Sequence, residues 1–569
     1  PSSPIELEEM RNKNQFISSQ GCGSSFFYFP PPEFRYVFVY SMEATSRGRQ
    51  SNQEEAMDMG NGKRLAINLV SNLIAFIIQF GINLFLTPYI VNSLGSEAYS
   101  FIPLTNNIIG YVTIINVAFY SMTGRFISVA LNQGDKKQAN IFFNSSTAAN
   151  CALTVFLIIP SILLVLYANK ILVIPDNLVK DVQLTFFFSL CSMNISMALA
   201  SFGAVYFVKN RVDLSARRNI EGNIIRVILL VVLFAIFKPK IYFINATMLV
   251  VTLYSCGANL YYTRKMMPEI TLNRTYVKKS AIKTLLSSGI WNSVNELSTV
   301  LLTTLDLLLA NLLAGSLASG NYSVAKTVPN FVQSIISVLV AVFVPQLTIY
   351  FAQKKQKEMI HNISFSVKFI GALSAIPVGF LLAAGQDFFQ LWVPTQDAKL
   401  LHGLSALTLI PLAITSCTSI INNVFTVTNK LRIPSLVLLV FGIANTIAVI
   451  VLMKYTPLGI WAIPTVALVT GIGRSFFFSP IYAAHCLGLK KKTFYPSIIR
   501  GTACTFIMAL VTFIYQAFLP TNSWVTLTLC GIICAVASSL INFVVVFNKS
   551  ERARIFEIFK TQLHKYLHK

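Results

Sequence analysis

The sequence predicts an all-α polytopic membrane protein with about fourteen transmembrane helices. Of its 569 residues, 54% are hydrophobic and only 12% are charged, whereas a typical soluble domain has about 25% charged residues. The mean hydropathy is +0.63. From about residue 65 onward, long apolar runs alternate with short polar breaks, and each run supplies the ~20 residues that a helix needs to cross a bilayer.

The polar breaks set the ends of the predicted spans. The least distinct break is Lys238-Pro239-Lys240, which separates two apolar runs by three residues only. We expect spans at 65–91, 99–120, 144–167, 182–206, 220–237, 241–262, 284–310, 322–350, 361–384, 400–427, 433–453, 459–486, 497–519 and 523–547.

Basic residues gather in alternate breaks. The breaks on one side, counted with the C-terminal tail, hold 28 Lys and Arg residues, and those on the other side hold six. Positive charge favours cytoplasmic loops. We therefore expect a multi-pass protein of the cell (inner or plasma) membrane with both ends of its helical core in the cytoplasm. The formal charge of +23 is then a topology signal, and we expect no nucleic-acid binding.

A weak internal repeat divides the helical region. A shift of 223 positions places Ser93–Ser100 over Ser316–Ser323 with five of eight residues identical. Each stretch follows the first helix of a six-helix set, which predicts a parallel repeat with a site between its halves. The expected parts are a disordered tail, or sequence upstream of the true start, at 1–62, an N-terminal lobe at 63–262, a basic cytoplasmic linker at 263–283, a C-terminal lobe at 284–487, two additional helices at 488–547 and a basic cytoplasmic tail at 548–569.

Short motifs accompany this repeat. They are Leu94-Gly95-Ser96-Glu97-Ala98-Tyr99, Ser121-Met122-Thr123-Gly124-Arg125-Phe126, Gln133-Gly134-Asp135-Lys136-Lys137-Gln138-Ala139-Asn140, Leu305-Asp306 and Gly320-Asn321-Tyr322-Ser323-Val324-Ala325. In these motifs the chain resembles the polysaccharide and O-antigen flippases of the multidrug/oligosaccharidyl-lipid/polysaccharide exporter superfamily.

The resemblance implies two six-helix lobes around a central cavity, working by alternating access. It implies that an undecaprenyl-diphosphate-linked glycan moves from the cytoplasmic to the outer leaflet, for O-antigen, lipopolysaccharide or other surface polysaccharide biosynthesis. The partners it implies are membrane lipids and other polysaccharide-assembly proteins.

Polar residues at helical spacing predict a hydrophilic interior. Asn292, Glu296, Thr303 and Asp306 fall on one face of the span at 284–310. Carboxylates inside a span should face water or a partner, and amides and hydroxyls suit the hydroxyls of a sugar. The predicted substrate cavity comprises Asn72, Gln79, Asn83, Asn292, Glu296, Thr303, Asp306, Lys326, Asn330, Gln333 and Asn422.

Three basic residues are candidates for contact with a diphosphate, namely Arg125, Arg226 and Lys326. Each has an alternative interpretation as an anchor that snorkels to the membrane interface. A pair between Asp306 and Lys326 is a further alternative, and it would make both residues structural.

Two other functions fit parts of the sequence. A cation-coupled multidrug exporter of the same superfamily would use Glu296 or Asp306 for a coupling H+ or Na+. A membrane glycan polymerase or ligase would need a catalytic outer loop, but 385–400 offers only Asp387, Asp397 and Lys399. We predict a transporter and not an enzyme, with no catalytic residue, no cofactor and no metal site.

Overall fold

Helices form wherever the sequence places an apolar run between turn residues. The computed structural model describes residues 51–428 and 430–553, and for residues 51–77, 79, 80, 83 and 115 it describes the backbone alone. Within these ranges every regular element is helical, which confirms the predicted all-α fold class. Most of the predicted tail at 1–62, and residues 554–569 of the tail at 548–569, lie outside the described residues.

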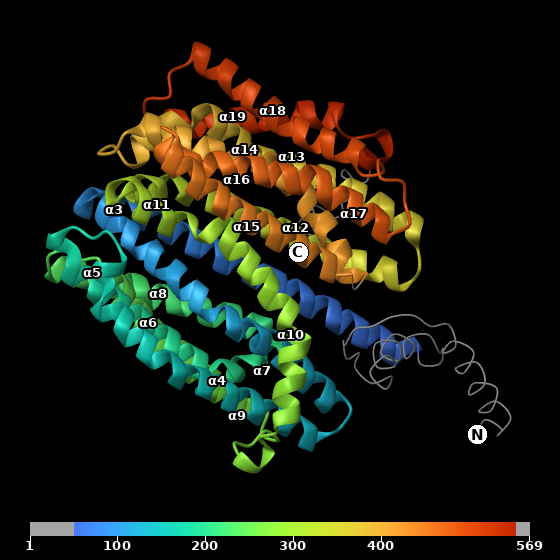
Figure 1. The fold of residues 1–569 in the computed structure, drawn as a ribbon. Coiled ribbons are helices and arrows are strands. Elements are labelled where there is room, and N and C mark those ends of the chain that lie inside the picture. The colour runs from blue at the N-terminus through green and yellow to red at the C-terminus, as the bar shows by residue number, and fades with distance from the viewer. Residues whose placement is uncertain (1–50, 429, 554–569) are drawn as a thin grey trace. The chain divides into compact units, whose positions relative to one another are not determined.

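The N-terminal lobe is built from long helices joined by short turns (Figure 1). Helices α4, α6, α8 and α9 pack side by side. The elements are α3 (Ser51–Asn132), α4 (Lys136–Leu166), α5 (Ala168–Ile171), a 3-10 turn (Asp176–Leu178), α6 (Val179–Ala198), a 3-10 turn (Ala200–Gly203), α7 (Ala204–Val208), α8 (Val212–Ile236) and α9 (Tyr242–Met266).

The C-terminal lobe follows a linker that contains a 3-10 turn (Arg274–Tyr276). Two of its spans contain π-helical segments, at Val300–Thr304 and Gly473–Phe478. The remaining elements are α10 (Lys279–Thr299), α11 (Asp306–Ala314), α12 (Ser316–Ala352), α13 (Gln356–Trp392), α14 (Ala398–Val427), α15 (Arg432–Tyr455), a 3-10 turn (Gly459–Trp461), α16 (Ala462–Ile472), α17 (Ser479–Cys486), α18 (Tyr495–Phe518) and α19 (Trp524–Val545).

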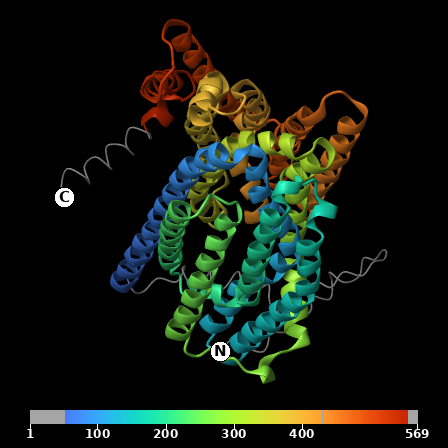
Figure 2. The ribbon, with the colours of Figure 1, turned by 90° about the vertical axis from the view of Figure 1, so that its left-hand side faces the viewer.

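The last two helices pack on the C-terminal lobe through α13. Figure 2 shows α18 and α19 (red) at one edge of the helix array. Close approach requires glycine here, because a Cβ on Gly371 of α13 would lie 2.8 Å from the Cα of Gly501 on α18. The two helix backbones therefore lie close together at these glycines, with the Cys417 sulfur of α14 beside them.

Each predicted span coincides with a helix or a broken helix. Among the described residues, ten helices are long and apolar enough to cross a membrane, and three bent pairs raise that number to thirteen. The predicted span at 65–91 falls in the first part of α3, where most side chains are not described. Even the least distinct pair is confirmed as two helices, α8 and α9, separated at Lys238-Pro239-Lys240.

The internal repeat is present in the backbone, but its offset is 220 positions and not 223. Gly95 and Gly315 interrupt equivalent helices, both at φ 87°. Gly134 and Lys354, at φ 78° and 56°, end the next helices with the same pair of backbone hydrogen bonds. A slip of three residues turns a helix by only about 60°, so side-chain patterns alone could not exclude the wrong register.

Candidate functional site

The helix that carries four of the eleven predicted cavity residues is broken at its centre. The π-helical segment Val300–Thr304 follows α10, and α11 begins at Asp306 after a bend of 41°. The N–H of Leu305 donates to the carbonyl of Val300 at 2.9 Å, a five-residue step. Such a break leaves neighbouring carbonyls open to side chains.

Side chains of both lobes use these carbonyls. The carbonyl of Thr304 accepts from Asn107 Nδ2 at 3.1 Å and from Tyr111 Oη at 2.8 Å. Both donors lie on α3 in the N-terminal lobe. The carbonyl of Leu301 accepts from Thr446 Oγ1 of α15 at 3.1 Å. The broken helix is therefore held from two sides by hydrogen bonds to its main chain.

Beside the break lies a buried ion pair. Lys326 Nζ is 2.9 Å from Asp306 Oδ2, and the two side chains are 11% and 4% exposed. The same ammonium donates to the carbonyl of Thr303 and lies 5.6 Å from the centre of the Tyr322 ring. Tyr322 Oη donates to Asp306 Oδ2 at 3.2 Å. Asp306 and Lys326 are thus fixed to one another, as in the structural alternative given above.

Four of the predicted cavity residues are exposed, although they lie near the middle of membrane-spanning helices. They are Glu296 and Thr303 on one span and Asn330 and Gln333 on α12. Glu296 has no ion-pair partner among the described residues. An ionised carboxylate facing lipid at this depth costs roughly 2.5–3.5 kcal/mol. The position of Glu296 is therefore more compatible with water than with lipid.

In the part of the chain whose side chains are described, the remaining predicted residues form no side-chain hydrogen bond with these four exposed residues. Asn292 is half-buried and donates to Ser121 Oγ at 3.1 Å. Asn422 is half-buried, and its Oδ1 lacks a hydrogen-bond partner. Arg125 is exposed, and Arg226 is half-buried with Nε unpaired. Asn72, Gln79 and Asn83 lie outside the residues whose side chains are described.

Sequence reasoning missed three residues of the site, Asn107, Tyr111 and Tyr322. A weak signal was present for each. Asn107 and Tyr111 are four residues apart, as are Tyr322 and Lys326, so each pair shares a helix face. Nothing in the sequence indicates that Asn107 and Tyr111 bond to a carbonyl nearly two hundred residues away.

The two lobes also contact each other next to Gly95 and Gly315, where the equivalent helices of the repeat are interrupted. Ser96 Oγ donates to Asn321 Oδ1 at 3.2 Å, and Ser316 Oγ donates to Glu97. Gly320 is required at this contact, because a Cβ there would lie 2.6 Å from the carbonyl oxygen of Ser96. A movement of one lobe against the other must break these contacts.

The linker between the lobes is bound along α4 by side-chain amides. Asn140 Nδ2 donates to the carbonyl of Glu269 at 2.8 Å, and Asn140 Oδ1 accepts from the N–H of Thr271 at 2.8 Å. One helical turn further, Asn144 Nδ2 donates to the carbonyl of Thr271 and Asn144 Oδ1 accepts from the N–H of Asn273. The two amides thus bind successive main-chain groups of the linker, and Asn140 Oδ1 also accepts from Thr271 Oγ1 at 3.4 Å.

This linker is fixed at both ends. Ser145 Oγ accepts from the N–H of Lys278 at 3.0 Å, at the start of α10. Lys209 Nζ lies 3.2 Å from Glu269 Oε1. Burial alone would raise the pKa of Glu269, but its backbone hydrogen bond and Lys209 hold that pKa below its ordinary value. The first turn of α10 is therefore tied to the N-terminal lobe.

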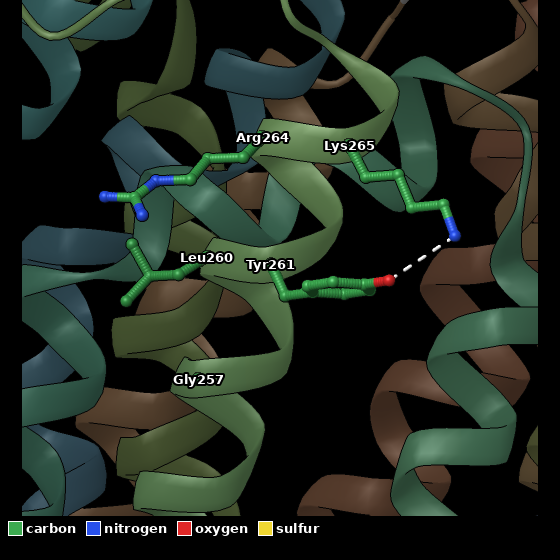
Figure 3. A pocket seen from close by; sticks show the side chains of 5 residues that line it. All are labelled: Gly257, Leu260, Tyr261, Arg264 and Lys265. Atoms are coloured by element: carbon green, nitrogen blue, oxygen red, sulfur yellow. Dashed lines mark hydrogen bonds between the residues drawn. The ribbon is translucent and has the colours of Figure 1, made fainter.

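An open hollow of about 520 Å³ lies elsewhere, near the end of α9 (Figure 3). In Figure 3 the Arg264 side chain points away from Lys265, whose Nζ donates to Tyr261 Oη at 3.4 Å. No predicted cavity residue lines this hollow, and its basic groups do not converge on a common point. We do not assign it as the site.

Comparison with solved structures identifies the fold. A structure titled lipid II flippase MurJ, inward closed conformation, matches with a TM-score of 0.58 at 12% identity, over 84% of this chain and 99% of that one. An inward-facing multidrug resistance MATE family transporter of the MOP superfamily matches with a TM-score of 0.57 at 13% identity, over 77% and 98%. The chain shares the fold of these two membrane transporters.

A sequence relative exists in Bacillus subtilis (strain 168), the uncharacterized membrane protein EpsK, which is 26% identical over 505 residues, covering 87% of this chain and 98% of EpsK. No protein-family model matches the sequence. The comparisons support a multi-pass membrane protein of this fold, and they leave the substrate to be inferred from the site.

Proposed function

We propose that this protein is a flippase that moves a lipid-linked oligosaccharide from the cytoplasmic to the outer leaflet of the cell membrane, for surface polysaccharide biosynthesis. An undecaprenyl-diphosphate-linked glycan, including O-antigen units, is the substrate class that the sequence resemblance implies. The proposal includes the orientation inferred from the basic breaks, with both ends of the helical core in the cytoplasm.

The observation that carries this proposal is the exposure of four polar side chains on two membrane-spanning helices, which we take to be a polar face on the substrate path. This face offers two amides (Asn330 and Gln333), a hydroxyl (Thr303) and one carboxylate (Glu296). Amides and hydroxyls both donate and accept hydrogen bonds, as sugar hydroxyls do. A polar headgroup crossing between the lobes needs such a surface, because the hydrocarbon core offers it no hydrogen bonds.

The alternative of a cation-coupled multidrug exporter draws less support from the site. Its coupling carboxylate would be Glu296 or Asp306, and Asp306 is buried in an ion pair with Lys326. Of these two candidates, Glu296 is the exposed one, and it has no ion-pair partner among the described residues. A mainly neutral polar face suits a glycan better than it suits a drug cation.

The test is a flipping assay in proteoliposomes, using a fluorescent polyprenyl-diphosphate oligosaccharide and, in parallel, a cationic dye. We expect the labelled glycolipid to become accessible at the opposite leaflet, and we expect no dye accumulation under a Na+ or H+ gradient. Dye accumulation without glycolipid movement would contradict the proposal.

A matched pair of variants locates the path. Gln333→Leu should lower glycolipid flipping at least severalfold, because it removes both hydrogen-bonding groups from the polar face. Val342→Leu, at a 53% exposed apolar position of the same helix, should leave flipping unchanged. Equal effects of the two changes would show that the polar face of α12 is not on the path.

A further inference from the structure

We propose that the Lys326 ammonium is a built-in substitute for a monovalent metal cation. The oxygens of Thr303 and Asp306 then form a Na+-type site, which this chain fills with its own side chain. This inference goes beyond the proposed function, because it concerns what the site binds and not what the protein moves.

The first argument is the nature of the ligands. Lys326 Nζ contacts a carboxylate oxygen of Asp306, at 2.9 Å, and the main-chain carbonyl of Thr303. Both are hard oxygen donors of the kind that hold alkali and alkaline-earth ions. Carbonyls freed at the break of a discontinuous helix are a recurring source of Na+ ligands in membrane transporters.

The second argument is charge. Asp306 is the one carboxylate that contacts the ammonium among the described residues. The carbonyls at the end of the α10 half of the broken helix add the negative end of its dipole. One positive charge balances the negative charge of the Asp306 carboxylate and these carbonyls. A divalent ion would leave a positive charge uncompensated in this buried site. The site therefore matches the charge of Lys+ or Na+.

The third argument is enclosure. Asp306 is 3% exposed and Lys326 9%, and the Tyr322 ring covers the ammonium. An ion in this position would be nearly free of bulk water, as the ammonium is. Because the lysine is covalently attached, it cannot be exchanged from either side of the membrane, so Asp306 is unavailable to a coupling ion.

The experiment measures thermal unfolding of the purified full chain in detergent, in NaCl, KCl and choline chloride at equal ionic strength. We expect wild-type Tm to be the same in all three salts. In Lys326→Ala, which vacates the site, we expect Na+ to raise Tm by on the order of 1–3 °C over choline, since a ligand that binds only the folded state stabilises it. In Asp306→Asn/Lys326→Ala this difference should vanish.

Two results would overturn the inference. One is a Na+-specific rise in wild-type Tm that Asp306→Asn abolishes, because Asp306 would then already bind a metal ion beside the lysine. The other is a folded Lys326→Ala protein that is indifferent to Na+.

A second variant covers the case in which Lys326→Ala does not fold. Lys326→Cys is treated with a reagent that attaches an aminoethyl group through a disulfide, which restores an ammonium, or with one that attaches an ethyl group. The aminoethyl adduct should regain a salt-independent Tm near the wild-type value, and the ethyl adduct should not. Equal Tm values for both adducts would show that the charge has no role at this position.

Discussion

At the scale of single residues, the site is governed by the high cost of a buried charge. A paired charge inside the protein is tolerated, but removing one partner typically costs about 3–5 kcal/mol because the other charge remains without compensation. Asp306 and Lys326 form one such pair, and Lys368 and Glu551 form another in which both side chains are 4% exposed. In both pairs the partners come from different helices, so each pair fixes a helix contact.

Asp306→Asn should lower the abundance of folded protein, because the Lys326 ammonium then keeps only a neutral carbonyl partner. The double change Asp306→Asn/Lys326→Met should restore abundance, since it leaves no buried charge. Fluorescence-detected size exclusion of the solubilised variants measures this directly. Normal abundance of Asp306→Asn alone would show that the pair contributes little to folding.

The second pair makes a similar prediction for the C-terminal segment. Glu551 also accepts a hydrogen bond from the N–H of Asn548 at 2.9 Å, so it holds the chain after α19 against α13. Glu551→Gln should destabilise the protein by about 3–5 kcal/mol, seen as a lower Tm. The control Lys549→Gln, at an exposed position two residues away, should leave Tm unchanged.

At the scale of elements, the broken helix α10–α11 belongs by sequence to the C-terminal lobe but is attached to both lobes. Its first turn is held by Ser145 of α4 through the linker, and its centre by Asn107 and Tyr111 of α3. On the other side it packs against α15, where a Cβ on Gly442 would lie 2.9 Å from Leu301. Movement of the lobes must therefore bend or release this helix.

The hydrogen bonds of Asn140 and Asn144 on α4 to the linker main chain predict that proline weakens linker binding at some linker positions and not at their neighbours. Thr271→Pro removes the N–H that Asn140 accepts, and hydrogen exchange at the Asn273 and Lys278 amides should accelerate as the linker detaches. Leu272→Pro alters a 63% exposed residue whose N–H neither asparagine uses, and exchange should stay slow. Exchange read residue by residue by mass spectrometry distinguishes the two. Equal acceleration in both would show that the linker is not bound through its main chain.

At the scale of the whole molecule, the direction of transport depends on the orientation in the membrane. The basic breaks predict that the linker is cytoplasmic and that 385–400 faces outward. A membrane-impermeant maleimide added to intact cells should label Lys399→Cys and spare Lys278→Cys, both at exposed positions. The exposed native Cys151 is replaced by Ser in both variants. The reverse labelling pattern would invert the proposed direction.

The contact between the lobes near Gly95 predicts how transport can be stopped. Ser96 and Asn321 are within hydrogen-bonding distance, so Ser96→Cys/Asn321→Cys should cross-link under oxidation and hold the two lobes together. We expect flipping to fall to background and to recover with a reducing agent, while each single cysteine variant stays active. Full activity of the cross-linked protein would mean that this contact need not open.

The sequence by itself determined the fold class and the positions of most helices in this protein, because hydropathy acts on each segment separately. A run of apolar residues needs a bilayer whatever it packs against, so even the short break at Lys238-Pro239-Lys240 could be placed correctly. Helical spacing placed Glu296, Thr303 and Asp306 on one helix face and Lys326, Asn330 and Gln333 on another, but it did not distinguish the exposed members from the buried Asp306 and Lys326.

Only the tertiary structure decided which polar groups pair with which. The structure shows that Asp306 bonds to Lys326 and that Asn107 and Tyr111 donate to the Thr304 carbonyl. It also shows that Asn140 and Asn144 bind the linker. These contacts join residues that are 20 to 197 positions apart in the sequence. The offset of the internal repeat was also decided by the structure, because the backbone conformations at Gly95 and Gly315 identify the equivalent positions. Such choices depend on where separate helices meet, and a periodicity within one helix carries no information about its neighbours.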